Sequence, residues 1–266
     1  MKIFSIIVFA IISQSLIPAI AQTENIDSLI TKVSLCQKER VNNVFTEKRD
    51  SAFTKFDLEI HKLFKHESFC KKTSDSVNRF FVTDKLNDKI EGKNLAYLFM
   101  NNIVVSNSLD GKLRTFSWDD LDGGSSHSYT NFIQVQTDSD KCLITQIDTA
   151  QFSIEVGYYQ IKQFRGNGSH FYLLTGYGTY GSGNHHWLVK IFEIKNDLLV
   201  ECINCYPDDH NLLIGSRRSQ NIDLKIDEKN NEISYKKYGF DYEMGYFSDE
   251  NDLIRLKLIN GKLIKQ

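Results

Sequence analysis

The feature that most constrains the fold is a stretch near the middle of the chain, residues 169–205, which is typical of three adjacent β-strands. Residues 171–175 form a short apolar run bounded by glycine, as in a strand that is buried on both faces. In residues 186–194 both alternating rows of side chains are largely apolar, so this strand also has two covered faces. Asn196 and Asp197 then provide a tight turn before a third strand. The stretch predicts an antiparallel meander.

This two-residue alternation continues through most of the C-terminal part of the chain. Residues 24–64 differ, because their apolar residues recur at intervals of three and four, which is typical of helices packed on a core. We therefore predict an α+β protein with a helical N-terminal segment (22–95) followed by a mostly antiparallel β-meander (96–266), either propeller-like or sandwich-like. From Leu95 onward we expect only the two-residue alternation of apolar and polar side chains that is typical of β-strands. The β region divides into about three modules of four strands that begin near Asn102, Gln151 and Leu212, a spacing similar to that of propeller blades.

The N-terminus predicts export. Residues 1–21 contain one lysine, an apolar core and Ala19-Ile20-Ala21 before Gln22, which is the pattern of a signal peptide with its cleavage site. No later stretch approaches the ~18 apolar residues of a transmembrane helix. We expect the protein to be periplasmic or secreted, with no integral membrane segment after cleavage. The formal net charge of −2 gives no electrostatic reason to expect nucleic acid as a partner.

The cysteines also fit an oxidising compartment. There are five, so at least one thiol is left without a partner in the same chain. Cys202 and Cys205 form a C-x-x-C motif that ends a strand, for which we favour a local disulfide over inert thiols, a metal site or a redox site. A bridge between Cys36 and Cys70 is a second candidate.

Two motifs that suggest chemistry lack the context that the chemistry requires. Gly176 to Gly181 spells GxGxxG after a strand, but a dinucleotide site needs a helix next, whereas the following segment alternates. We expect a long hairpin loop there. Ser182 lies in Gly181-Ser182-Gly183 and does not make the GxSxG of a nucleophile elbow.

One segment carries a resemblance. Ser108-Leu109-Asp110-Gly111-Lys112-Leu113-Arg114, followed by Ser117-Trp118-Asp119, resembles a segment of exported, uncharacterised Bacteroidetes-type proteins and is similar to a WD-repeat blade. The Gly-His element of WD repeats is missing. The resemblance covers about twenty residues and implies a propeller-like sheet; it implies no activity.

Two loops collect the candidate ligand-binding residues. The first carries Trp118, Asp119, Asp122 and His127, and the second carries Tyr177, Tyr180, His185 and Trp187. If the hairpins stack in register, both loops lie at one edge, where aromatic rings and carboxylates suit a polar ligand such as a sugar.

Simpler roles are open for the same residues. The aspartates suit turns that bond to nearby backbone amides, and the tryptophans suit a core. His185 and His186 are adjacent in a predicted strand, so they point to opposite faces and cannot chelate one ion together. We predict no metal site and no cofactor, and we expect Arg217 and Arg218 to lie in a solvated loop.

These observations favour an exported, non-catalytic, β-rich binding protein whose partner is an unspecified protein or glycan. The alternative is a periplasmic or secreted hydrolase that uses an Asp/His cluster, for which an aspartate and one of His127, His185 and His186 would have to lie within ~4 Å of one another in a concave pocket.

Overall fold

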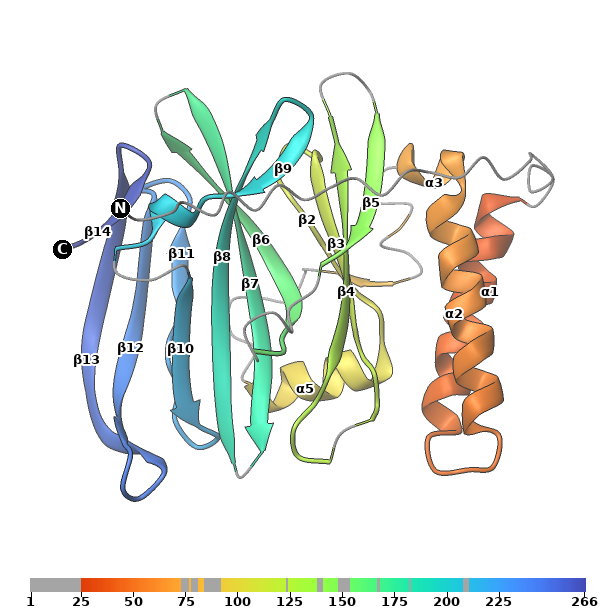
Figure 1. Ribbon diagram of the computed structural model, residues 1–266, viewed down its shortest axis with the longest axis horizontal. Helices are drawn as coiled ribbons and strands as arrows, with labels where there is room; N and C mark the ends of the chain where they lie inside the picture. Colours follow the sequence, from red (N-terminus) through yellow and green to blue (C-terminus); the bar gives the residue numbers. More distant parts are fainter. Residues whose placement is uncertain are drawn as a thin grey trace, which may run out of the picture.

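Helices make up most of the N-terminal part of the chain that the structure describes. The computed structural model describes residues 25–72, 77, 81–83, 92–122, 124–137, 141–147, 154–166, 168–181, 183–207 and 211–266. The predicted signal peptide lies outside these residues. The helices are α1 (Ile26–Asn42), α2 (Arg49–Lys65), α3 (Glu67–Cys70) and α5 (Gly92–Asn101). Three β-sheets follow, nearly all antiparallel, which confirms the α+β class (Figure 1).

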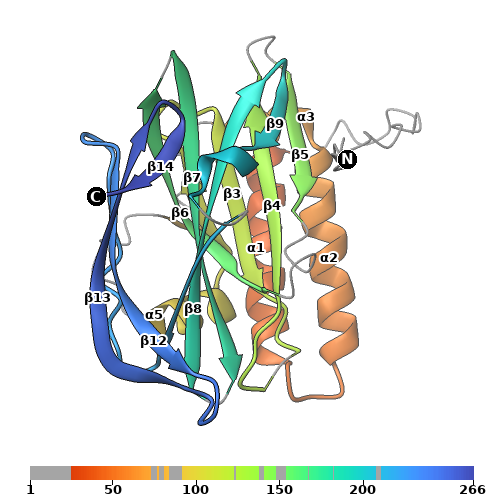
Figure 2. The same cartoon turned by 60° about the vertical axis from the view of Figure 1, so that its left-hand side comes forward.

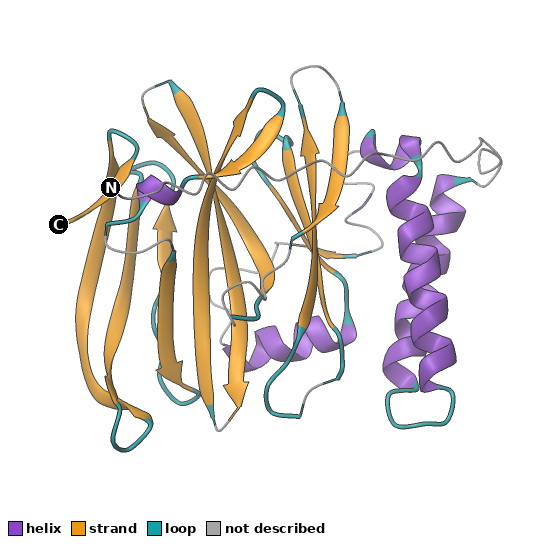
Figure 3. Ribbon diagram, in the orientation of Figure 1, coloured by secondary structure: helices purple, strands orange, loops and turns teal. Residues whose placement is uncertain are grey.

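Helices α1 and α2 form a pair for the reasons that the sequence suggests. The Asn25 side chain caps α1 by accepting a hydrogen bond from the backbone N–H of Asp27. The apolar stripe of α1 includes Ile30 and Val33, and that of α2 includes Phe56 and Ile60; all four side chains are fully buried. Figure 3 shows the two helices side by side, apart from α5.

The first sheet has the order β1-β2-β3-β4-β5. Its strands are β1 (Val82–Thr83), β2 (Val104–Asn107), β3 (Leu113–Asp119), β4 (Tyr129–Gln136) and β5 (Cys142–Gln146). β1 pairs with β2 in parallel, and the other pairs are antiparallel.

The second sheet contains the stretch from which the sequence analysis began. Its order is β10-β8-β7-β6, with β9 also paired to β8. The strands are β6 (Gly157–Gly166), β7 (Ser169–Gly181), β8 (Asn184–Lys195), β9 (Leu198–Glu201) and β10 (Leu212–Arg217). Asn196 and Asp197 have φ angles of 52° and 63°, so the predicted tight turn is confirmed.

The third sheet is a four-stranded meander near the C-terminus. It consists of β11 (Lys225–Asp227), β12 (Glu232–Asp241), β13 (Tyr246–Ile259) and β14 (Lys262–Lys265), paired in that order. The β12–β13 hairpin is long, and its register shifts between Tyr238 and Phe240.

The layers are stacked in the order helices, first sheet, second sheet, third sheet (Figures 1 and 2). Each junction has its own apolar core. Phe116 and Phe132 of the first sheet pack against α1 and α2. The second sheet lies between the other two, with Leu188 facing the first sheet and Val189 facing the third. Both faces of β8 are therefore covered, as its two apolar rows predict.

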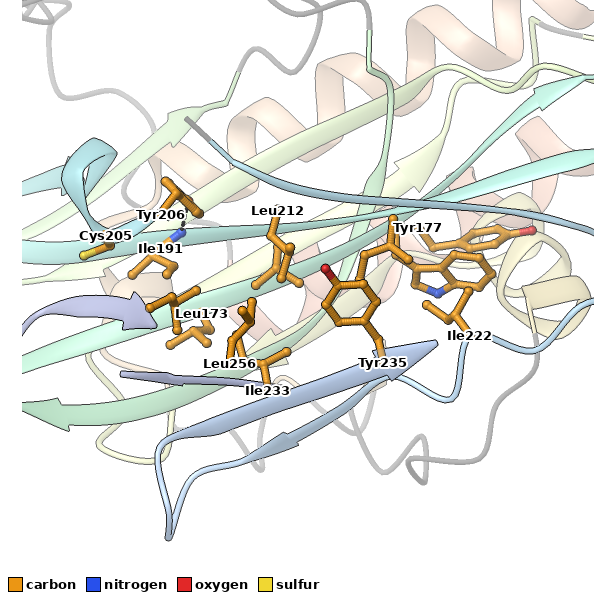
Figure 4. Packing of buried hydrophobic residues seen from close by; sticks show 14 of the residues in the cluster. Leu173, Tyr177, Ile191, Cys205, Tyr206, Leu212, Ile222, Ile233, Tyr235 and Leu256 are labelled. Carbon is orange, nitrogen blue, oxygen red and sulfur yellow. Dashed lines mark hydrogen bonds between the residues drawn. The ribbon is translucent and has the colours of Figure 1, made fainter. Parts of the chain in front are cut away.

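Figure 4 shows the core between the second and third sheets. Leu173 and Tyr177 of β7 point toward Ile233, Tyr235 and Leu256 of the third sheet. At one end of this core, the backbone N–H of Ile191 donates a hydrogen bond of 2.7 Å to the hydroxyl of Tyr206.

Three sequence expectations about elements are wrong. Residues from Leu95 to Asn101 belong to helix α5 and do not alternate as a strand, because Leu95 and Phe99, one helical turn apart, pack into the core. Leu212 does not open the third sheet, since β10 pairs with β8 of the second. The GxGxxG segment from Gly176 to Gly181 is the end of strand β7 and not a loop.

The disulfides confirm one expectation and correct another. Cys202 and Cys205 are bonded across the 3₁₀ helix η2 (Ile203–Cys205). Cys70 pairs with Cys142 and not with Cys36. The Cys70–Cys142 bond joins helix α3 to the edge strand β5. Cys36 is a free, buried thiol.

A search of the described helices finds none that has both the length and the apolar character needed to cross a lipid bilayer.

Candidate functional site

The two loops that the sequence singles out lie side by side at one end of the sheets. Ser126 of the β3–β4 loop forms an isolated antiparallel bridge with Tyr180 at the end of β7. The Thr179 hydroxyl donates a hydrogen bond of 3.0 Å to the carbonyl of Ser125, and the Ser126 hydroxyl donates one of 3.2 Å to the carbonyl of Thr179. We call the end formed by residues 119–122, 124–129, 177–181 and 183–187 the rim. It joins the first sheet to the second.

The glycines of β7 make this close approach feasible. A Cβ atom on Gly178 would lie 2.1 Å from the carbonyl oxygen of Glu155 and 2.4 Å from Nε2 of His186. A Cβ atom on Gly176 would lie 2.5 Å from Cγ2 of Val156. The glycines are therefore needed because residues 154–157 cross directly over the strand, and they do not form a phosphate-binding loop.

Asp119 and His127 form an ion pair beneath the rim. Nδ1 of His127 lies 2.6 Å from Oδ2 of Asp119, whose side chain is fully buried. The other carboxylate oxygen accepts a hydrogen bond of 2.7 Å from the backbone N–H of Leu121, so the predicted turn role of Asp119 is confirmed. The hydrogen bond that the His127 ring donates to the Asp119 carboxylate raises the pKa of His127 above its usual value, although burial opposes this.

Arg40 supports the same loop from the helical layer. Its guanidinium donates a hydrogen bond of 2.7 Å to the backbone carbonyl of Asp119 and lies 4.7 Å from the ring centroid of Phe56. The neighbouring carboxyl of Asp120 is removed from water, which raises its pKa to about 6, and it accepts a hydrogen bond from the Thr130 hydroxyl. Arg40 thus fixes the position of the first loop.

On the side of the second sheet, Tyr177, His185 and Arg218 are connected. The Tyr177 hydroxyl lies 2.9 Å from Nδ1 of His185, and Nε of Arg218 donates a hydrogen bond of 3.0 Å to Nε2 of His185. Because a guanidinium can only donate, Nε2 accepts, and the proton of a neutral His185 ring is assigned to Nδ1. Arg218 also donates its backbone N–H to the carbonyl of Gly183. The prediction of a solvated loop is confirmed for Arg218, which is exposed in a turn, whereas Arg217 is the last residue of strand β10.

His186 points to the opposite face from His185, as predicted. Its Nε2 lies 2.9 Å from the backbone carbonyl of Glu155, and its ring is 4.1 Å from the ring of Tyr180, measured between centroids. Burial lowers the pKa of His186 to about 4, so its imidazole is neutral at physiological pH. The ring of His186 supports the half-exposed ring of Tyr180.

Both tryptophans belong to cores. Trp118 is buried against helix α2, with its ring 5.4 Å from that of Phe56 and 5.7 Å from that of Phe132. Trp187 is buried on the side of the third sheet, 5.3 Å from the ring of Tyr177. Both tryptophans therefore have the core role that the sequence analysis gave as the simpler alternative.

Few of the candidate residues face the solvent. Tyr180 is 46 % exposed, Asp122 is exposed and His127 is partly exposed. The others are buried: Trp118, Asp119, Tyr177, His185 and Trp187. The surface that the rim presents is therefore small and polar, with one aromatic ring.

The chemistry available at the rim is that of an oriented imidazole and nearby hydrogen-bonding groups. No group of three or more metal-ligating side chains occurs among the residues that the structure describes. A hollow of 480 Å³ is found on the outer face of the third sheet, where its lining includes Lys225, Lys236 and Arg255. It contains none of the rim residues.

The sequence analysis missed Arg40 and Arg218 as parts of this site, whereas Tyr129 stands at the end of the first loop that it singled out. The hydroxyl of Tyr129 is buried and has no hydrogen-bond partner among the described residues, and burial raises its pKa. No local pattern could have indicated Arg40, since it reaches Asp119 across 79 residues of sequence. Arg218 carried a weak signal, because a basic pair directly follows an alternating strand.

Comparison of the chain with protein-family models, with curated proteins and with solved structures finds no match.

Proposed function

We propose that this chain is an exported, non-catalytic binding protein that recognises a polar ligand, a glycan or a protein surface, at the rim. The observation that carries the proposal is the bridge between Ser126 and Tyr180, which joins two loops from different sheets. Tyr180 lies over the neutral ring of His186, and its own ring is half exposed. A preorganised aromatic ring beside hydrogen-bonding groups is suited to stacking on a ligand.

The supports beneath the rim agree with a binding role. Arg40 fixes the backbone of Asp119, and Arg218 fixes the turn at Gly183. Because both loops are held from below, binding loses little conformational entropy. His127 and Asp122 add polar groups at the surface.

Two further parts of the proposal concern location and architecture. The bonds Cys70–Cys142 and Cys202–Cys205 support an oxidising compartment, such as the periplasm or the extracellular space. The separate cores on the two faces of the second sheet support a sandwich-like arrangement in preference to a propeller-like one.

The test is a glycan-array screen combined with a pull-down, followed by affinity measurements on each hit with three variants. Tyr180→Ala should weaken binding about 10-fold or more, because it removes the stacking ring. Tyr180→Phe should retain most of the affinity. Leu109→Ala changes an exposed side chain in the β2–β3 turn, outside the rim, and should have no effect. Equal affinity of Tyr180→Ala and the unmodified protein for every hit would contradict the proposal.

A hydrolase is the second candidate, and one distance favours it. The 2.6 Å separation of Nδ1 of His127 from Oδ2 of Asp119 meets the geometric requirement for an imidazole oriented by a carboxylate. In this role Asp119 would orient the ring, and Nε2 of His127 would take a proton from water.

A panel of chromogenic esters and glycosides tests the hydrolase directly. A hydrolase would show turnover that His127→Gln abolishes and that Asp119→Asn lowers by about 100-fold or more. If turnover is the same in the His127→Gln variant as in the unmodified protein, this candidate fails and the binding proposal is unaffected.

A further inference from the structure

The tip of the β12–β13 hairpin exposes a group of large apolar side chains. Tyr242 is 89 % exposed and Met244 is 68 % exposed, and Phe240 and Tyr246 are each more than a third exposed. Single exposed apolar residues are common on proteins, but four within seven residues concentrate exposed apolar surface at one turn. We call residues 240–247 the hairpin tip. Figure 1 shows it at the lower end of the molecule, at the foot of β12 and β13.

The hairpin tip has a defined conformation. The carboxylate of Asp241 accepts hydrogen bonds from the backbone N–H groups of Glu243 and Met244, at 2.9 and 3.0 Å. Gly245 provides the positive φ of 69° that closes the turn. The rings of Phe240 and Tyr242 are in contact, with centroids 5.1 Å apart. Tyr242 and Met244 are therefore held outward by an ordered turn.

Contacts with the second sheet anchor the base of the hairpin. The ring of Phe247 lies against Gly215 of β10, where a Cβ atom would be 2.2 Å from Cζ of the ring. The side-chain amide of Gln220 donates a hydrogen bond of 2.5 Å to the carbonyl of Ser248, and Arg217 pairs with Asp249. The base is fixed, and Arg217 also lies over the ring of Tyr246, while the side chains of Tyr242 and Met244 beyond it are exposed.

The charge near the tip of this hairpin is one-sided, whereas further along the strands Lys237 lies opposite Asp252. Between Tyr238 and Ile254 there are five carboxylates, at Asp241, Glu243, Asp249, Glu250 and Asp252. The same stretch has no lysine or arginine, and within the described part of the chain Asp249 forms an ion pair with Arg217. Such a surface repels anionic lipids and nucleic acids and attracts cationic groups.

One edge of β13 is open over most of its length. β14 pairs with β13 only between Leu256 and Ile259, whereas β13 begins at Tyr246. On that side, residues 246–254 have no strand partner within the described part of the chain. Charged side chains on an edge strand also discourage indiscriminate pairing, so the carboxylates would restrict which strands can add there.

We propose that the hairpin tip and the open edge of β13 bind an extended polypeptide segment of a partner protein, one that carries Lys or Arg side chains next to apolar ones. The partner backbone extends the third sheet as a further strand. Its apolar side chains contact Tyr242 and Met244, and its cations meet Glu243, Glu250 and Asp252. Arg217 at the end of β10 lies between this surface and the rim, because its guanidinium is 5.6 Å from the ring of Tyr246 and its backbone pairs with Asn184. The inference does not depend on the function proposed at the rim.

The experiment uses a fluorescent decapeptide of alternating Lys and Val as the probe, with fluorescence anisotropy as the readout. Binding should be saturable and should weaken as salt is raised. A peptide of alternating Glu and Val should not bind, and one of alternating Lys and Ser should bind at least about 10-fold more weakly. A Lys/Val peptide with two central prolines should also lose affinity, because proline cannot donate to a strand edge.

Three variants locate the site on the protein. The double variant Tyr242→Ala, Met244→Ala removes the apolar contacts, and the triple variant Glu243→Gln, Glu250→Gln, Asp252→Asn removes the charges. Each should lower the affinity about 10-fold or more. Leu109→Ala is the matched control for loss of an exposed apolar side chain, and it should bind as the unmodified protein does. Circular dichroism of each variant establishes that the fold is retained.

Several outcomes would overturn the inference. Equal binding of the Lys/Val and Lys/Ser peptides would show charge attraction alone. Unchanged affinity in the double variant would remove the hairpin tip from the site. Hairpin-dependent binding to vesicles of phosphatidylserine, or hairpin-dependent dimerisation in sedimentation, would each identify a different occupant and contradict the proposal.

Discussion

The β7–β8 and β12–β13 hairpins are alike in sequence character and opposite in environment. Both are long and rich in aromatic residues. In β7–β8 the rings of Tyr177 and Trp187 are buried between two sheets, and the hydroxyl of Tyr177 is satisfied by His185. In β12–β13 the side chains of Tyr242 and Met244 are in solvent. The number of layers around a hairpin decides this difference.

The comparison teaches where recognition can occur in a layered protein. The second sheet is covered on both faces, so its aromatic residues stabilise the stack, and only Tyr180 is left for contact with a ligand. The third sheet is an outer layer, and its longest hairpin ends beyond the core. The buried aromatic residues of β7–β8 should therefore matter for folding, and Tyr242 at the hairpin tip should matter for binding.

The largest effect is expected for Trp187→Ala. The substitution removes a large buried side chain from the core between the second and third sheets and should lower the free energy of unfolding by about 3–5 kcal/mol. Urea denaturation measures this value. A loss below about 1 kcal/mol would show that β8 is not enclosed in this way and would break the comparison.

Gly178→Ala should have the next largest effect, about 1–3 kcal/mol of lost stability. Its new Cβ would overlap the carbonyl of Glu155 and the ring of His186, so the crossing of residues 154–157 over β7 would have to shift. Gly124→Ala is the matched control at the rim, because nothing lies within 4 Å of its Cβ position. Thermal unfolding of both variants would test the role of the crossing, and similar Tm values would argue against it.

A smaller effect concerns the pH dependence at the rim. The pKa of His127 is raised in the folded protein, so the stabilisation from its pair with Asp119 is complete below the unfolded pKa, about 6.5, and is lost as pH rises through the folded pKa. Because the imidazole is partly exposed, we expect less than about 1 kcal/mol. An NMR titration should give a pKa above 6.5 for His127 and a lower one in Asp119→Asn. An unchanged value in the variant would exclude Asp119 as the cause.

The smallest effect on stability is expected for Tyr242→Ala. The side chain is 89 % exposed, so its removal should change the free energy of unfolding by no more than about 0.5 kcal/mol. Urea denaturation of Tyr242→Ala and Trp187→Ala, side by side, compares the loss in free energy of unfolding between the two hairpins. A loss above about 1 kcal/mol would mean that the hairpin tip is part of the fold.

Alternation and turn residues were sufficient to predict most strands, and the three- and four-residue spacing predicted α1 and α2. Helix α5 was missed because Leu95 and Phe99 lie in a short apolar stretch, where the two periods cannot be distinguished. The place of β10 in the second sheet was also missed, since pairing between distant strands depends on the whole stack.

The candidate site was predictable as a pair of adjacent loops, but the exposure of its residues was not. Tyr177 and Trp187 have the composition of a ligand-binding loop, and only the third sheet, supplied by later residues, shows that they are covered. The β12–β13 hairpin did carry a readable signal. Five carboxylates without a single cation between Tyr238 and Ile254, interspersed with aromatic residues, are unusual for a strand that packs on both faces.

The free thiol of Cys36 provides a native labelling site in the buried face of α1. The other four cysteines are bonded in pairs, so a thiol-specific label can react at one position only. That position is on the buried side of α1, where desolvation raises the pKa of the thiol and slows its reaction further. The rate of labelling consequently measures how often α1 and α2 separate from the β-sheets, without the need to introduce a probe.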